Sequence, residues 1–217
     1  AGEKITERDN EKLLGVWIQN DLNWDTHVQK LTSDLNYVVS MIRRLRSHLG
    51  LEELKTIADG MFMSRMRYAL TVFAAEFLRI SDSDPTPNAL QKLQRSQNEL
   101  LRAMTGKRRR DHEKSSVMLE RVGFLSINQL IAYGILMDTW KAREFQVPVL
   151  ENLLNRQRND ERTLRSDSSN KASATRSEIY ALNAERLWNL STDKFKNTNL
   201  LKVAKAEAKA LALRLPM

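Results

Sequence analysis

Several kinds of residue and pattern are missing or rare in this chain. It has no cysteine, and its 217 residues include only seven glycines and four prolines. Without cysteine it can form neither a disulfide nor a thiolate zinc site, and it has no cysteine nucleophile. No apolar run approaches the roughly 20 residues of a membrane span, and no secretory signal is evident. We therefore expect an intracellular protein, in the nucleus, the cytoplasm or both, with no membrane partner.

The patterns that carry most enzyme chemistry are also absent from the sequence. A nucleotide polymerase holds two magnesium ions with carboxylates, but no Asp-Asp pair occurs, and Asp82-Ser83-Asp84 lies in a proline-flanked loop. The glycines form no phosphate-binding loop. His27, His48 and His112 are too widely separated to indicate a metal site. We expect no catalysis by this chain alone, and no cofactor or metal.

Positive charge is what the sequence has in excess. Lysine and arginine outnumber the acidic residues by 35 to 27, which gives a formal net charge of +8. Such a balance favours polyanionic partners such as nucleic acid. Hydrophobic residues make up 41% of the chain, which is enough to build a substantial core.

Apolar residues recur at spacings of three and four along most of the chain, which predicts a mainly α-helical fold. The clearest stripe runs through Val28, Leu31, Leu35, Val38, Ile42, Leu45 and Leu49. The predicted helices cover residues 24–49, 51–78, 88–105, 126–145, 176–190 and 200–215, with a further short helix that ends near residue 157. Gly50 and Gly106 are expected to end the first and third helices. Capping boxes are expected at Asn88 and at Ser126.

The N-terminal segment has a different pattern, typical of a short strand or hairpin. Leu14, Val16 and Ile18 alternate with their neighbours, as residues of a β-strand do. Asn20-Asp21 then provides a turn before the first helix. Gly15 has two interpretations here: a bulge or close strand approach, or room for a nucleic-acid backbone.

These patterns divide the chain into four expected segments. They are a strand or hairpin over 1–23, a helical bundle over 24–157, a flexible linker or loop over 158–175, and a C-terminal helical segment over 176–217. The linker prediction rests on composition, because residues 158–175 are rich in Arg, Asp, Ser and Asn and contain one large aliphatic residue, Leu164.

Two basic clusters are candidate binding residues. Arg43, Arg44 and Arg46 lie near the end of the first predicted helix, where they would also complement the helix dipole. The second cluster follows the third helix and consists of Lys107, Arg108, Arg109 and Arg110. It fits a solvated loop, a phosphate contact or a nuclear-targeting signal.

Aromatic side chains can stack on nucleic-acid bases, and the chain has four tryptophans. Trp17 is the best placed to do so, because it faces the opposite side of its strand from its apolar neighbours. The other three, Trp24, Trp140 and Trp188, fit core positions in a helical domain.

Several segments, in the right order, resemble the C-terminal part of reverse transcriptases from non-LTR retrotransposons. The stretch Lys12-Leu13-Leu14-Gly15-Val16-Trp17-Ile18, followed by Leu22-Asn23-Trp24-Asp25-Thr26-His27, is similar to the family's primer-grip hairpin and the start of its thumb. Residues 93–106 are similar to the family pattern L-Q-x-x-Q-N-x-x-L-R-x-(I/M)-T-G. Residues 42–49, 51–68 and 119–130 also resemble the family, as do Leu187-Trp188-Asn189 and Phe195-Lys196. The chain departs from the family at Ser64, at Val72-Phe73-Ala74 and in lacking a cysteine-rich tail.

The resemblance implies a helical thumb-like bundle with a primer-grip hairpin, and none of the catalytic aspartates of the parent RNA-directed DNA polymerase. It implies that Lys12, Leu13, Leu14, Gly15 and Val16 form the grip, and that the first helices lie along the minor groove of the template–primer. The implied partners are RNA or an RNA–DNA hybrid, held mainly through phosphates, and the palm domain. The alternative is a helical protein-interaction module that binds a second copy or a host protein.

Overall fold

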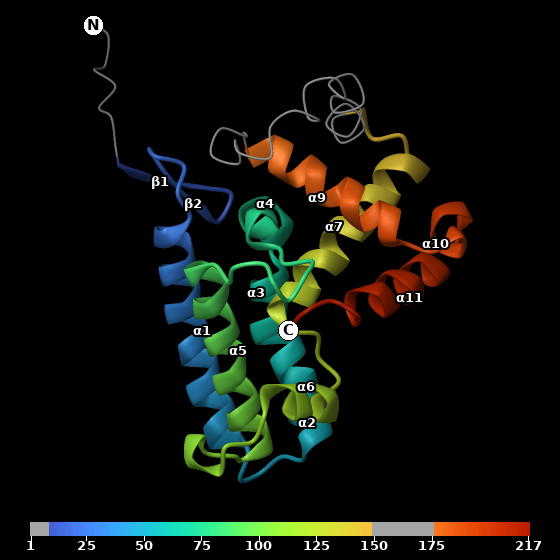
Figure 1. Ribbon diagram of the computed structural model, residues 1–217. Helices are drawn as coiled ribbons and strands as arrows, with labels where there is room; N and C mark the ends of the chain where they lie inside the picture. The colour runs from blue at the N-terminus through green and yellow to red at the C-terminus, as the bar shows by residue number, and fades with distance from the viewer. Residues whose placement is uncertain (1–8, 149–175) are drawn as a thin grey trace, which may run out of the picture. The chain divides into compact units, whose positions relative to one another are not determined.

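The computed structural model describes residues 9–148 and 176–217 (Figure 1). The fold is mainly α-helical with one antiparallel hairpin near the N-terminus, which confirms the predicted fold class. The chain forms two compact units, here called unit 1 (Ala1–Ala69 and Pro87–Phe124) and unit 2 (Leu70–Thr86 and Leu125–Met217). The predicted linker over 158–175 and the predicted short helix ending near residue 157 lie outside the described residues.

The hairpin consists of β1 (Asn10–Leu13) and β2 (Val16–Gln19), joined by Leu14 and Gly15. Both connecting residues have positive φ, +47° and +88°, as the central residues of a two-residue type I′ turn do. Gly15 therefore belongs to the turn itself, and the interpretation as a bulge within a strand is wrong. The chain reverses direction at these two residues, so the alternating residues 14–18 do not belong to one continuous strand.

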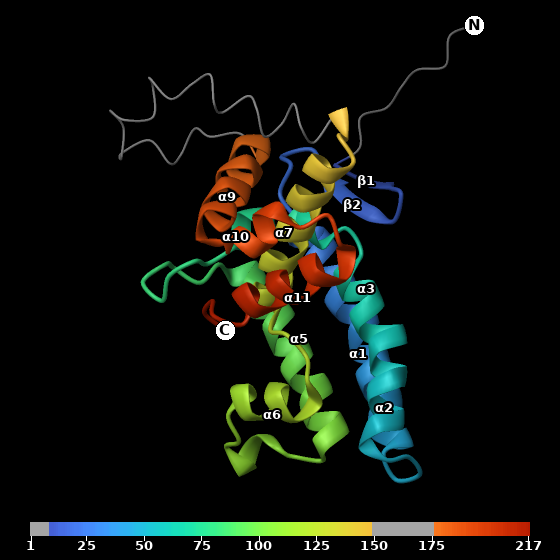
Figure 2. The same cartoon turned by 90° about the vertical axis from the view of Figure 1, so that its right-hand side faces the viewer.

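Unit 1 is built around two long helices that pack side by side, α1 and α5 (Figures 1 and 2). Its helices are α1 (Asp25–Leu45), α2 (Leu51–Ala58), α3 (Ser64–Arg67), α5 (Asn88–Thr105) and α6 (Ser115–Val122). The predicted stripe of α1 faces inward: Val28, Leu35, Val38 and Ile42 are fully buried. The predicted face of α5, from Leu90 to Met104, is buried as well. Periodic apolar residues therefore predicted the packing faces of both helices correctly.

Two predicted helix ends and one predicted helix cap in this part of the chain are wrong. Helix α1 ends at Leu45, and Gly50 instead precedes α2 in an extended conformation. At the start of α5 the N-cap position is taken by Pro87, and no side chain caps the helix, so the capping box at Asn88 does not form. The prediction for Gly106 is confirmed, since it ends α5 in the left-handed conformation with φ +73°.

The other wrong helix end belongs to the predicted helix over 51–78. Helix α2 continues through a π-helical turn (Asp59–Met63) into α3, which ends at Arg67. Tyr68 is then extended and Ala69 has φ +53°. The Tyr68 hydroxyl donates to the carbonyl of Leu14 in the hairpin turn. The break thus places Tyr68 against the hairpin, a long-range contact that local periodicity does not encode.

Unit 2 centres on α7 (Ile127–Glu144), which packs against α4 (Leu70–Ala74), α9 (Arg176–Leu190) and α11 (Leu201–Ala212). A short helix, α10 (Asp193–Asn197), precedes α11. The predicted capping box of α7 is confirmed: Ser126 Oγ accepts from the amide of Gln129, and Gln129 Oε1 accepts from the amide of Ser126. Among the described residues, none of the helices combines the length and apolar character needed to cross a membrane.

Candidate nucleic-acid interface

A hollow of about 340 Å³ lies in unit 1 where the C-terminal ends of α1 and α5 meet. It is lined by Arg43, Arg46, Glu99, Arg102, Ala103, Gly106, Lys107, Arg108 and Arg109. Six of these residues are cationic and one is acidic, so the hollow is strongly electropositive. Clustered arginine and lysine on an open surface is the usual electrostatic signature of a site for polyanions.

Helix geometry explains how cations from distant parts of the sequence gather here. Arg43 and Arg46 are three residues apart near the end of α1, which places them on one face of that helix. Packing of α1 on α5 brings this face beside the end of α5. Gly106 then turns the chain in the left-handed conformation, so that the basic residues after it line the same hollow.

The Arg46 guanidinium lies directly over Gly106. A Cβ atom at this position would overlap that guanidinium. The guanidinium is the far end of a flexible side chain and can move aside, so it is the left-handed backbone, with φ +73°, that favours glycine at position 106.

Glu99 is the carboxylate at which three of the five arginines of the hollow converge. Its Oε1 accepts from Arg109 through Nε at 2.9 Å and Nη2 at 2.8 Å, and from Arg102 Nη1 at 3.0 Å. Arg43 Nη2 lies 3.7 Å from Oε2. One carboxylate thus orders three arginines that come from α1, α5 and the following loop.

Two further carboxylates, those of Glu113 and Asp111, order the rest of the basic loop. Glu113 pairs with Arg121 at 2.8 Å and with Lys107 at 3.7 Å. The amide of Arg108 donates to Asp111 at 2.7 Å. In the part of the chain that the structure describes, no carboxylate is within ion-pair distance of Arg46 or Arg108. These two guanidinium groups are available to an anion from outside.

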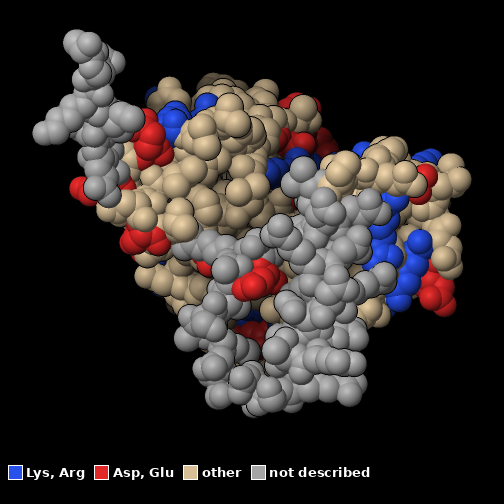
Figure 3. Space-filling view, turned by 90° about the horizontal axis from the view of Figure 1, so that it is seen from above, with Lys and Arg blue, Asp and Glu red and all other residues tan. Residues whose placement is uncertain are grey.

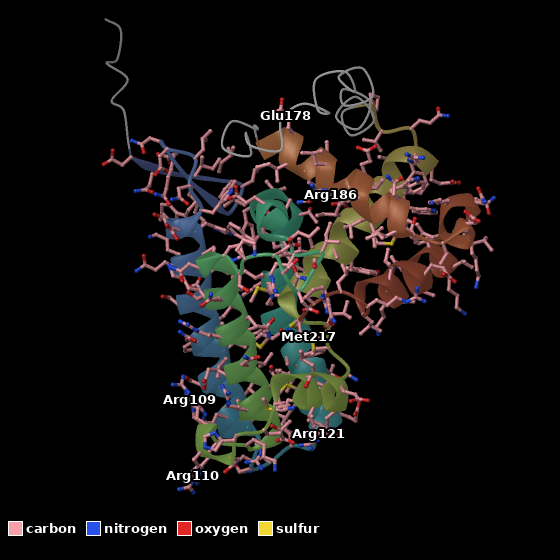
Figure 4. The ribbon with its side chains drawn as sticks, in the orientation of Figure 1. Arg109, Arg110, Arg121, Glu178, Arg186 and Met217 are labelled. Carbon is pink, nitrogen blue, oxygen red and sulfur yellow. The ribbon has the colours of Figure 1, made fainter. Side chains whose placement is uncertain are left out.

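The structure separates the predicted basic residues into two groups. Arg43, Arg46, Lys107, Arg108 and Arg109 line the hollow together. Arg44 and Arg110 do not: Arg44 Nε donates to the Ser40 carbonyl along its own helix, and Arg110 points away from Arg109 at the end of unit 1 (Figure 4). Figure 3, which views another face, shows small groups of Lys and Arg interspersed with acidic side chains.

Sequence reasoning did not single out Glu99 and Arg102 as site residues. A usable signal was present, because the two lie three residues apart near the end of α5 and form an ion pair along the helix. Their role became visible only once α1 and the loop supplied partners for the same carboxylate.

The predicted grip residues, 12–16, form a surface separate from the basic hollow. Lys12, Leu13 and Leu14 are exposed, with Leu14 83% exposed at the turn, whereas Val16 is buried. The hairpin adjoins the first turn of α1, while the hollow lies at its last turn. About 30 Å of helix, at 1.5 Å per residue, separates the two clusters.

Two lysine ammonium groups lie beside the Trp17 ring. The Lys30 Nζ lies 4.0 Å from its ring centroid, and Lys12, its cross-strand partner, lies at 5.9 Å. Cation–π attraction holds both ammonium groups beside the ring. A nucleic-acid base could stack on the Lys30 face of Trp17 only by displacing that side chain, and the ammonium groups themselves suit phosphate contacts.

The other tryptophans occupy core or partly buried positions, as predicted. Trp24 and Trp140 are buried, and the Trp140 indole donates to the Thr198 carbonyl at 2.9 Å. Trp188 packs edge-on against Phe195, and the Arg143 guanidinium lies 3.8 Å from its ring centroid.

Three wholly or partly buried polar groups have shifted protonation equilibria. Burial lowers the pKa of His27, whose Nδ1 accepts the backbone amide of Trp17 at 3.4 Å. In unit 2, burial raises the pKa of Asp138, although a hydrogen bond from Thr71 and the charge of Lys141 oppose the shift. Burial and the nearby Asp138 charge raise the pKa of Tyr180. None of these groups lines the basic hollow.

The described residues contain no group of three or more His, Cys, Asp or Glu side chains arranged to hold a metal ion. Comparison of the chain with protein families, with curated proteins and with solved structures found no match.

Proposed function

We propose that this chain is a non-catalytic nucleic-acid-binding region that holds a template–primer or an element RNA for a polymerase palm domain. It would correspond to the thumb and downstream region of a non-LTR retrotransposon reverse transcriptase. The observation that carries the proposal is the basic hollow between the ends of α1 and α5. The sequence resemblance over most of the chain supports it independently.

The chemistry of the hollow favours contacts with phosphate. Guanidinium groups donate to phosphate oxygens in a bidentate geometry. The hollow presents these donors without an aromatic platform among its lining residues, so it offers charge and hydrogen bonds and no surface for base stacking. Binding should therefore be largely independent of sequence and should weaken steeply with salt.

The test measures binding of the chain to a labelled RNA–DNA hybrid across a salt series. The test variant is K107A/R108A/R109A, which removes three cations from the hollow. The matched control is K202A/K205A/K209A, which removes three exposed cations from α11 and leaves the hollow intact. Both variants lose the same charge, so the comparison isolates position from net charge.

We expect the hollow variant to bind the hybrid at least tenfold more weakly, with a salt slope shallower by about two to three. The α11 variant should change affinity by much less. Equal weakening in both variants would show that binding follows net charge alone. Binding no stronger than that of an unrelated basic protein would overturn the proposal.

The alternative, a protein-interaction module, is favoured by one observation. Leu13 and Leu14 are 59% and 83% exposed at the tip of the hairpin, where an apolar partner could cover them. The test is sedimentation of the chain beside an L13T/L14N variant. Asparagine suits the left-handed turn position, so the hairpin should persist. A native dimer that becomes a monomer in the variant would support the alternative. Monomers in both cases would exclude binding to a second copy of the chain.

A further inference from the structure

Glu99 occupies the position in the hollow at which an incoming anion would meet the most donors. Three nitrogens of Arg102 and Arg109 lie within 3.0 Å of its Oε1, and Arg43 approaches Oε2. A carboxylate and a phosphate present oxygens of similar charge to a guanidinium. The donor set that Glu99 engages is therefore the set that a phosphate would need.

The partners of Glu99 differ in freedom. Glu99 belongs to helix α5, one face of which is buried, and its side chain is 23% exposed. Arg109 lies in the loop after this helix, and its side chain is 80% exposed. An exposed ion pair of this kind is weak and exchanges readily with other ions. Arg109 can therefore transfer from Glu99 to an external anion while α5 stays in place.

Resting on the proposed function, we infer that Glu99 is a specificity-determining residue that competes with phosphate for the arginines of the hollow. A single phosphate gains little by replacing a carboxylate that already satisfies Arg43, Arg102 and Arg109. A nucleic-acid backbone gains more, because further phosphates reach Arg46 and Arg108, which have no carboxylate partner among the described residues. Glu99 thus favours polyanions over small anions.

The test compares E99Q with the native chain and with E120Q. Glutamine keeps the shape and a neutral acceptor at position 99. Glu120 is exposed on α6 in the same unit and does not line the hollow, so E120Q controls for the loss of one negative charge. Circular dichroism checks that each variant is folded, and E99A provides a second removal of the carboxylate.

The first measurement is affinity for the RNA–DNA hybrid at fixed salt. We expect E99Q and E99A to bind about fivefold more tightly than the native chain, and E120Q to stay within about twofold. Unchanged or weaker binding by E99Q would overturn the inference, because Glu99 would then serve only to order the arginines. An equal gain in E120Q would overturn it too, since the effect would be net charge.

The second measurement needs no nucleic acid. Inorganic phosphate is added at constant ionic strength while the melting temperature is recorded, because a ligand of the folded state raises it. We expect a concentration-dependent rise for E99Q and a much smaller one for the native chain and E120Q. Equal rises in all three would contradict competition by Glu99. Failure of the native chain to bind the hybrid, with the phosphate response of E99Q intact, would reject the proposed function and retain the role of Glu99.

Discussion

At the scale of single residues, the hairpin depends on the backbone freedom of Gly15. Its φ of +88° is costly for any residue with a Cβ, and an added Cβ would lie 3.3 Å from the Tyr68 ring. G15A should lower the free energy of unfolding by about 1–2 kcal/mol, measured by urea denaturation. Gly60 is the control, because it lies in the π-helical turn and an added Cβ there would have no atom within 4 Å apart from its chain neighbours and the backbone of its own helix. G60A should be neutral or stabilising, and equal losses in both variants would rule out this account of Gly15.

His27 gives the fold a dependence on pH. Because burial lowers its pKa below its ordinary value of 6.5, the unfolded chain binds a proton at a higher pH than the folded chain does. The stability linked to His27 is complete above about pH 6.5 and is lost as the pH falls through the lowered pKa. H27Q, which keeps an acceptor for the Trp17 amide, should flatten this dependence in urea denaturation between pH 7 and 5. H48Q, at an exposed position, should leave it as in the native chain.

At the scale of elements, the first turn of α7 fastens two distant segments of unit 2. Asn128 is buried, its Oδ1 accepts the Arg79 amide, and its Nδ2 donates to the carbonyls of Arg79 and Pro216. N128A would leave these part-buried backbone groups without the side-chain amide that they bond to. The expected loss is about 2–4 kcal/mol in the free energy of unfolding. N189A, at an exposed position on α9, should change it by less than about 0.5 kcal/mol.

Helices were predictable to the extent that their determinants are local. The apolar stripes of α1, α5 and α7, the glycine end of α5 and the capping box at Ser126 all depend on residues within one or two turns. The break after Arg67 was not predictable in this way. Tyr68 there leaves the helix to meet the hairpin turn, 54 residues away in the sequence, and tertiary contact overrides helix propensity.

At the scale of the whole molecule, the net charge of +8 predicts affinity for polyanions without saying where they bind. Elution from a heparin column can distinguish binding through net charge from binding at the hollow. K107A/R108A/R109A and K202A/K205A/K209A each remove three positive charges, yet the hollow variant should elute at clearly lower salt. Elution of both variants at the same salt would mean that the charge is used diffusely and the hollow has no special role.

The division of the chain into two compact units depends on packing and not on composition. Each is made of two stretches of chain, with changes of unit after Ala69, Thr86 and Phe124. The proline-containing loop near Thr86 is a visible signal, but nothing comparable marks the change after Ala69. Packing joins segments by their buried faces, and a sequence pattern shows that a face is apolar without showing which other face covers it.

The amino-acid pattern alone predicted the helical class, the buried faces of the long helices, a strand or hairpin near the N-terminus and the excess of positive charge. These properties depend on spacing and composition, which act over a few residues. Helix packing, and not local sequence, places Arg43, Arg46, Lys107, Arg108 and Arg109 in one hollow and leaves Arg44 and Arg110 outside it. It also placed Glu99 at the centre, because convergence of charges depends on how α1 packs on α5, and that packing is set by contacts between residues far apart in the chain.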